Sequence, residues 1–162
     1  MEDIVKSLGH LALGTRLKRV SEQLQRQAQE VLESFGVTVT AAHFPVLAAL
    51  DRLGPASVSV LAEALGVAQP GVTRALNKLE AEGLVEAQDA GSDRRVRTVK
   101  LSATGARLIK RAKAVVWPAV ERAVADACRF PDGPLLDQIG KLEAALERRR
   151  LIERAPRRRR AS

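Results

Sequence analysis

The sequence predicts a mainly α-helical fold with one small β-hairpin. Apolar residues recur at helical spacing over most of the 162 residues. Two short stretches near the middle, 84–87 and 96–101, have the composition of strands, and the second alternates. The composition, 46% hydrophobic and 28% charged, is that of an ordinary soluble domain. A chain of this length and composition favours a single domain with a sizeable core.

Several classes of protein are excluded by what the sequence lacks. No apolar run approaches the roughly 18 residues of a membrane span, and no signal peptide is recognisable, so we expect a cytoplasmic protein without a membrane partner. One cysteine, Cys128, and two histidines, His10 and His43, are too few for a disulfide framework or a metal site. Because no catalytic or cofactor-binding motif is present, we expect no enzyme activity, no cofactor and no metal.

Positive charge is concentrated at the C-terminus. The net charge of the chain is +8, and the segment Arg148–Ser162 carries eight arginines and one glutamate. The rest of the chain is therefore nearly neutral, at +1. Any nucleic-acid binding by the folded part must depend on where its charges lie.

The N-terminal third predicts two helices. Apolar residues between Leu13 and Phe35 line one face of a long amphipathic helix, and Gly36 follows it as a C-terminal glycine. Thr40 is placed to cap the next helix. Pro45 falls in the first turns of that helix if it begins near Ala41, where proline is tolerated.

Two short helices and the hairpin follow. Ser57 is expected to cap the first helix, Gly66 to form the tight turn, and Pro70 to open the second helix, which Gly83 ends. The strands are joined by the polar residues 88–95. Helix, tight turn, helix and hairpin is the order of a winged helix-turn-helix, whose second helix enters the major groove of DNA.

The C-terminal third predicts two more helices. Ser102 is expected to cap a long helix that reaches Ala127 and that Trp117 and Pro118 bend, and a last helix covers Leu135 to Leu146. The expected organisation is an N-terminal dimerisation helix (1–35), the DNA-binding domain (36–101), C-terminal dimerisation helices (102–150) and a basic disordered tail (151–162).

The second helix of the helix-turn-helix separates into two faces. Val72, Leu76 and Leu79 form its core stripe, which leaves polar and basic residues without an acid on the outer face. At the hairpin tip, arginines next to Asp93 suit the narrow minor groove. A solvated helix face would look similar, but it would leave the basic tip unexplained. The expected DNA contacts are Ser57, Gln69, Pro70, Thr73, Arg74, Asn77, Lys78, Asp93, Arg94, Arg95 and Arg97.

These stretches resemble the MarR family of bacterial transcriptional regulators. The residues that carry the resemblance are 58–67, 69–85, 93–95 and 101–105. The resemblance implies a homodimer that binds a pseudo-palindromic site in double-stranded DNA, with Arg74 matching the recognition-helix arginine and Asp93 and Arg95 the wing pair. The chain departs from the pattern at Ala68, where members commonly place a capping serine, and at Val60, where an acid would complete a capping box.

The terminal helices predict a dimer interface. A small winged helix cannot bury their apolar stripes, so a second subunit is the expected partner; the alternative is a monomer whose terminal helices fold back. The expected interface residues are Ile4, Leu8, Leu11, Leu135, Ile139, Leu142 and Leu146.

The resemblance also implies a ligand pocket between this interface and the winged helix. Arg16, His43, Phe44 and Trp117 supply a plausible lining for a small aromatic or amphipathic carboxylate.

The expected function is a sequence-specific transcriptional regulator, a repressor that a small-molecule ligand releases from DNA. Two alternatives stay open: a nonspecific DNA-binding protein tethered by its arginine tail, and a helical adaptor that uses the winged helix for protein contacts. Cys128 is expected to be a structural residue, since it lies among apolar neighbours late in a helix.

Overall fold

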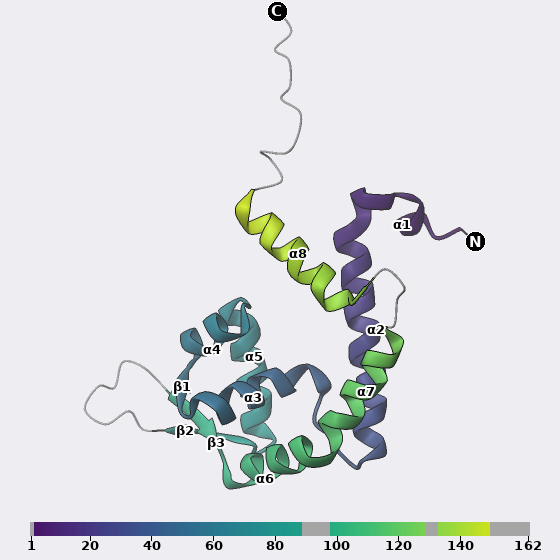
Figure 1. The fold of residues 1–162 in the computed structure, drawn as a ribbon. Helices are drawn as coiled ribbons and strands as arrows, with labels where there is room; N and C mark the ends of the chain where they lie inside the picture. Colours follow the sequence, from purple (N-terminus) through teal and green to yellow (C-terminus); the bar gives the residue numbers. More distant parts are fainter. Residues whose placement is uncertain (1, 89–97, 129–132, 150–162) are drawn as a thin grey trace, which may run out of the picture. The chain divides into compact units, whose positions relative to one another are not determined.

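The computed structural model describes residues 2–88, 98–128 and 133–149, which form two compact units, Met1–Glu121 and Arg122–Ser162. Its described part is mainly helical with one small antiparallel sheet, so the predicted fold class is confirmed (Figure 1). The first unit contains α1 (Ile4–Ser7), η1 (Gly9–Ala12), α2 (Leu13–Ser34), η2 (Ala41–His43), α3 (Phe44–Leu53), β1 (Ala56–Ser57), α4 (Val58–Leu65), α5 (Gln69–Ala81), β2 (Val85–Gln88), β3 (Thr98–Leu101), α6 (Ala103–Arg111) and the π-helical η3 (Ala112–Val116). Helix α7 (Trp117–Ala127) crosses the boundary between the units, and α8 (Leu135–Arg148) lies in the second.

The sheet has one strand more than the predicted hairpin. Its order is β1-β3-β2, and both pairs are antiparallel, with Ala56 opposite Val99 and Val85 opposite Leu101. Strand β1 has only two residues, too few to show an alternating pattern in the sequence. It anchors the start of α4 to the base of the hairpin.

The helix-turn-helix forms where local signals predict it. The Ser57 hydroxyl accepts a hydrogen bond from the backbone N–H of Val60 and so caps α4. Gly66 ends α4 in the left-handed conformation, at φ 64°, which glycine adopts without strain. Ala68 precedes α5 and, as predicted, supplies no side-chain cap, whereas Pro70 lies in the first turn of α5.

The core of the first unit lies between the helix-turn-helix, the sheet and α6. Leu47, Leu61, Leu79 and Ile109 come from four different helices, and all four side chains are fully buried. Helix α3 packs against α4, α5, α6 and β3. Helix α5 is therefore held on a rigid base through its apolar face.

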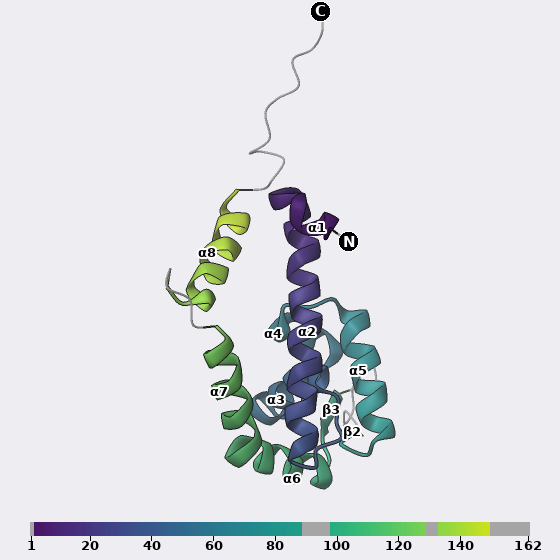
Figure 2. The same ribbon diagram turned by 90° about the vertical axis from the view of Figure 1, so that its right-hand side faces the viewer.

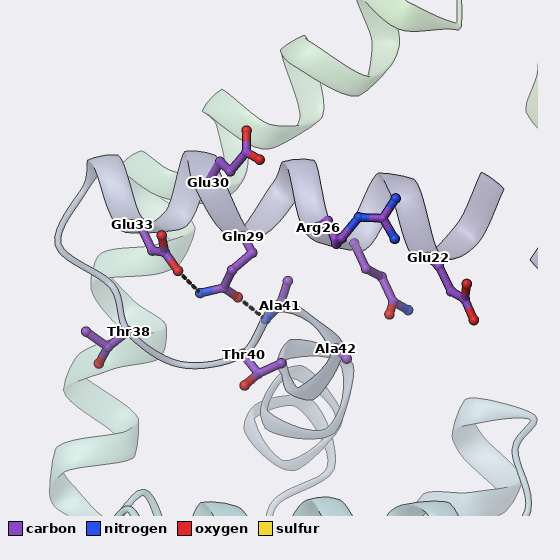
Figure 3. Close-up of a pocket in the computed structure, with 10 residues that line it drawn as sticks. Glu22, Arg26, Gln29, Glu30, Glu33, Thr38, Thr40, Ala41 and Ala42 are labelled. Carbon is purple, nitrogen blue, oxygen red and sulfur yellow. Dashed lines mark hydrogen bonds between the residues drawn. The ribbon is translucent and has the colours of Figure 1, made fainter. Parts of the chain in front are cut away.

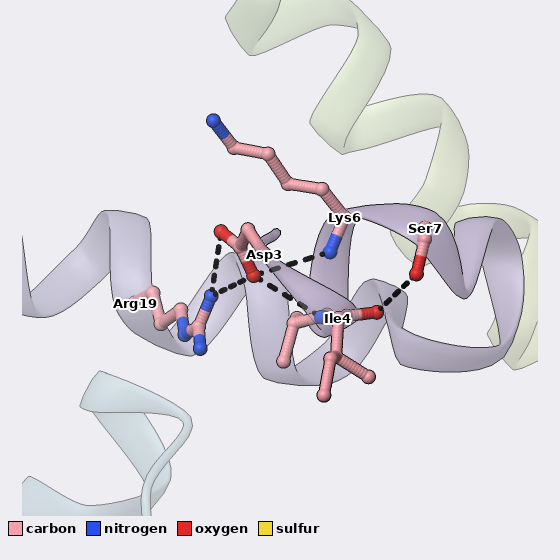
Figure 4. A network of polar contacts seen from close by, with 6 residues as sticks. Asp3, Ile4, Lys6, Ser7 and Arg19 are labelled. Atoms are coloured by element: carbon pink, nitrogen blue, oxygen red, sulfur yellow. Dashed lines mark hydrogen bonds and ion pairs between the residues drawn. The ribbon is translucent and has the colours of Figure 1, made fainter. Parts of the chain in front are cut away.

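Helix α2 connects the core with the N-terminal end of the unit. The C-terminal half of α2 lies beside the helices α3 to α6 and contacts η2, while its N-terminal half extends beyond these helices (Figures 1 and 2). There, Asp3 caps α1 through the N–H groups of Val5 and Lys6 and accepts two hydrogen bonds from Arg19 of α2, at 2.9 and 3.1 Å (Figure 4). The Arg19 guanidinium holds the pKa of Asp3 below its usual value. This network ties α1, which the helical spacing did not predict, to α2.

Two details of the predicted elements differ in the structure. Thr40 does not cap the following helix, and its hydroxyl accepts a hydrogen bond from Lys78. The α-helix also begins later than expected, at Phe44, after a single 3₁₀ turn at 41–43. The prediction of a cap at Thr40 was wrong: the only hydrogen bond of its hydroxyl among the described residues comes from the distant Lys78.

The predicted bend at Trp117 and Pro118 takes the form of a π-helical turn, Ala112–Val116, directly before them. Proline has no N–H to donate to the carbonyl of Ala114, four residues earlier, so the regular α-helical bonding is interrupted here. An ion pair between Lys113 and Asp51 of α3 holds the irregular turn against the core.

Candidate nucleic-acid interface

Helix α5 presents two chemically different faces. Val72, Ala75, Leu76 and Leu79 are buried, as the helical spacing predicts. The predicted DNA contacts on this helix are all exposed: Gln69, Pro70, Thr73, Arg74, Asn77 and Lys78. No acidic residue lies between the first and the last of these positions. The exposed face thus offers amide, hydroxyl and basic groups that match base edges and phosphates.

Few of these side chains are already engaged by the protein. Arg74 and Asn77 form no hydrogen bond or ion pair with another described residue. The Thr73 hydroxyl donates to the Gln69 carbonyl at 3.1 Å, and the Lys78 ammonium donates to the Thr40 hydroxyl at 3.4 Å. The arginine and asparagine are therefore free to form bidentate contacts with bases.

Ser57 lies in a different environment from the other predicted contacts. It is 9% exposed, and its hydroxyl is shared between the Val60 N–H and the Ser59 hydroxyl, 2.8 Å away. The structure thus places Ser57 at the cap of α4 and in the sheet, whereas Ser59 is exposed at the start of the same helix. Sequence spacing alone could not separate the two serines, because the short strand β1 buries the first.

The base of the wing is described, whereas its tip is not. The last residue of β2, Gln88, pairs with the first residue of β3, Thr98. An ion pair of 3.3 Å joins Lys100 and Glu86 across the two strands. The predicted contacts at the tip lie outside the described residues, and their roles stay predictions: Asp93, Arg94, Arg95 and Arg97.

The predicted ligand-binding residues are brought together only in part. The rings of Phe44 and Trp117 meet edge to face, with their centroids 6.2 Å apart, and His43 directly precedes Phe44. Phe44 is buried in the core, and Trp117 packs against it. Arg16 is exposed near the start of α2 and forms no hydrogen bond or ion pair with another described residue.

His43 is an unusual side chain within this group. Its Nδ1 atom is buried and has no hydrogen-bond partner among the described residues. Burial lowers the pKa of His43 below its ordinary value of 6.5; the positive charge of Lys78 lowers it further, and Glu82 opposes the shift. Burial and the charge of Lys78 on α5 thus both favour the neutral form of the imidazole.

We expect the stability of the protein to decrease as the pH falls below about 6.5, the ordinary pKa of histidine. The unfolded chain then binds a proton at His43 that the folded protein resists, so protonation favours unfolding. Urea unfolding at pH 7.5 and 5.5 measures the change. His43→Asn should reduce the pH dependence of the unfolding free energy. The matched control is His10→Asn, at an exposed histidine, which should show the same pH dependence as the unaltered chain. The same pH dependence in both variants would contradict the assignment to His43.

A groove of about 720 Å³ lies between α2 and the segment 38–42 (Figure 3). It is lined by Glu22, Gln25, Arg26, Gln29, Glu30, Glu33, Thr38, Thr40, Ala41 and Ala42. None of the four predicted ligand-binding residues lines it. Among the described residues, no cluster of histidine, cysteine and acidic side chains suits a metal ion, and no helix there has the length and hydrophobicity to cross a membrane.

Comparisons with known proteins agree with this geometry. Residues 35–96 match the model of the MarR family. A cysteine-to-serine mutant of MarR from E. coli, solved in complex with operator DNA, is 24% identical; the match covers 91% of this chain and 98% of that chain, with a TM-score of 0.66. The transcriptional repressor CouR, bound to a 23-mer DNA duplex, is 26% identical, with 87% and 95% covered and a TM-score of 0.62. BpsR from Bordetella bronchiseptica, whose DNA binding is regulated by 6-hydroxynicotinic acid, is 20% identical, with 84% and 91% covered and a TM-score of 0.62.

Proposed function

We propose that this chain is a MarR-family winged helix-turn-helix transcriptional regulator, and that it represses transcription by binding a pseudo-palindromic operator as a homodimer. The observation that carries this proposal is the exposed face of α5, which has no acidic residue between Gln69 and Lys78 and is backed by a fully packed core. Arg74 and Asn77 at its centre are unengaged and suit guanine and adenine edges in the major groove.

The terminal segments support the homodimer. Large apolar side chains stay exposed in both: Ile4, Leu8 and Leu11 are 69%, 46% and 85% exposed, and Ile139, Leu142 and Leu146 are 36%, 36% and 42% exposed. Exposed apolar surface of this extent is typical of an interface between subunits. A two-fold dimer would also place two recognition helices about 34–36 Å apart, in successive major grooves.

The ligand in this proposal is a small aromatic carboxylate that releases the dimer from its operator. The half-buried Trp117, which packs edge to face against the buried Phe44, offers an aromatic ring, and the half-buried His43 directly precedes Phe44. The known regulation of BpsR by 6-hydroxynicotinic acid supports a ligand of this chemical class. Such a ligand lowers DNA affinity only if it binds more tightly to the conformation that does not fit the operator.

Selection of duplexes from a randomised DNA library tests the proposal. The protein should enrich a sequence with two related half-sites, and an electrophoretic mobility shift should show the same preference in DNA upstream of its own gene. Equal binding to random duplexes would instead favour the nonspecific alternative.

Phenolic and aryl carboxylates are then tested for release of the selected duplex, and the test of any active compound is repeated with Arg16→Ala and His43→Ala. Full response in both variants would place the ligand pocket elsewhere.

A further inference from the structure

The first turn before α3 receives its cap from another helix. Thr40 precedes this turn but forms no side-chain cap, so the backbone N–H of Ala41 needs an acceptor from elsewhere. The Gln29 side-chain carbonyl, from α2, accepts this hydrogen at 2.7 Å, and the Gln29 amide donates to the Glu33 carboxylate at 3.1 Å (Figure 3). Gln29 thus fixes the start of the turn to the long N-terminal helix.

Thr40, the residue before Ala41, forms a hydrogen bond to helix α5. The Thr40 hydroxyl accepts the hydrogen bond of the Lys78 ammonium at 3.4 Å, from the last turn of α5. Lys78 is an exposed residue on the DNA-facing side, and its long side chain has many rotamers when nothing holds it. Two adjacent residues, Thr40 and Ala41, therefore connect Gln29 of α2 with Lys78 of α5.

We propose that Gln29 is a positioning residue for DNA recognition: by capping Ala41 it holds Thr40, and through Thr40 it holds Lys78 where a DNA phosphate can meet it. The inference rests on the proposed function, because it assigns Lys78 a contact with the operator. Gln29 itself lines the groove beside α2, and the proposal assigns it no contact of its own with DNA. Gln29 raises the affinity for DNA because Lys78, already held by Thr40, loses less side-chain conformational entropy when it binds a phosphate.

Loss of the Gln29 side chain should weaken binding without unfolding the protein. In Gln29→Ala, the N–H of Ala41 loses its acceptor, and Thr40 is no longer held against Lys78. We expect the affinity for the selected duplex to fall about three- to tenfold, the range for one long side chain that has to be ordered on binding. The matched control is Gln25→Ala, one turn earlier on α2, which lines the same groove and forms no hydrogen bond to another described residue.

A double-mutant cycle with Lys78→Met distinguishes positioning from a general structural effect. Binding of the fluorescently labelled selected duplex is measured by anisotropy for the full chain, for both single variants and for the double variant, and each unfolding midpoint is measured alongside. If Gln29 acts through Lys78, Gln29→Ala should have no further effect in the Lys78→Met protein. An equal loss in both backgrounds, or an equal loss in Gln25→Ala, would overturn the inference.

A charge-neutral exchange provides the rescue. The variant Gln29→Glu combined with Glu33→Gln keeps an acceptor for the Ala41 N–H and keeps the bond between positions 29 and 33, with the donor and acceptor reversed. Its affinity should return to within about twofold of the unaltered chain, well under the tenfold that 1.4 kcal/mol represents. An exchange variant as weak as Gln29→Ala would overturn the inference. Failure of the unaltered chain to select any duplex would overturn the proposed function itself, and this inference with it.

Discussion

Replacing Arg74 with alanine is expected to weaken binding to the selected duplex by about 1–3 kcal/mol, or about 5- to 150-fold. Arg74 lies on the exposed face of α5, and no described residue engages its guanidinium. It is therefore free to form a bidentate contact with guanine, which discriminates strongly between bases. Selection with the Arg74→Ala protein should also show relaxed sequence preference at the position that the arginine contacts.

The matched control for this prediction is Arg52→Ala. Arg52 is an exposed arginine in the same domain, on α3, where it lines a separate groove with Leu53 and Leu65. Removing it changes the net charge by the same amount, so any loss that comes only from long-range attraction to DNA should appear in both variants. If Arg74→Ala weakens cognate and random DNA equally, Arg74 contacts phosphate and does not read a base.

Replacing Leu142 with glutamate is expected to convert the proposed dimer into monomers. Leu142 is 36% exposed on α8, and its neighbours on the same face are Ile139 and Leu146. Glutamate would place an unpaired charge in an apolar interface, which costs several kcal/mol, and a two-fold interface contains the residue twice, so at least about 3 kcal/mol is lost. Sedimentation velocity should show a dissociation constant at least about 100-fold higher, and operator affinity should fall with it because one half-site cannot hold the protein alone.

Lys141→Glu is the control for the dimer prediction. Lys141 is the exposed neighbour of Leu142, and this substitution changes the net charge by two, more than the leucine variant does. If charge alone dissociated the dimer, Lys141→Glu should act at least as strongly. A Leu142→Glu protein that stays dimeric would remove this face of α8 from the interface, whereas an unaltered chain that already sediments as a monomer would favour the monomeric alternative.

The sequence by itself determined the elements whose signals are local. Val72, Leu76 and Leu79 follow the helical period, so the buried face of α5, and with it the exposed candidate DNA face, could be predicted. The caps at Ser57 and Ser102 formed as expected, because the hydroxyl and the N–H that it accepts are three residues apart in the chain. Contacts of this kind need no knowledge of the rest of the fold.

Only the tertiary structure decided the features whose partners are distant in the chain. Gln29 meets Ala41 across 12 residues, and Lys78 meets Thr40 across 38. These pairs follow from the packing of α2 against η2 and of α5 against α3. The same holds for Ser57, which looks like an accessible serine in the sequence but is buried because β1 pairs with β3. Periodicity and capping describe one element at a time, whereas these hydrogen bonds depend on which elements the hydrophobic core brings together.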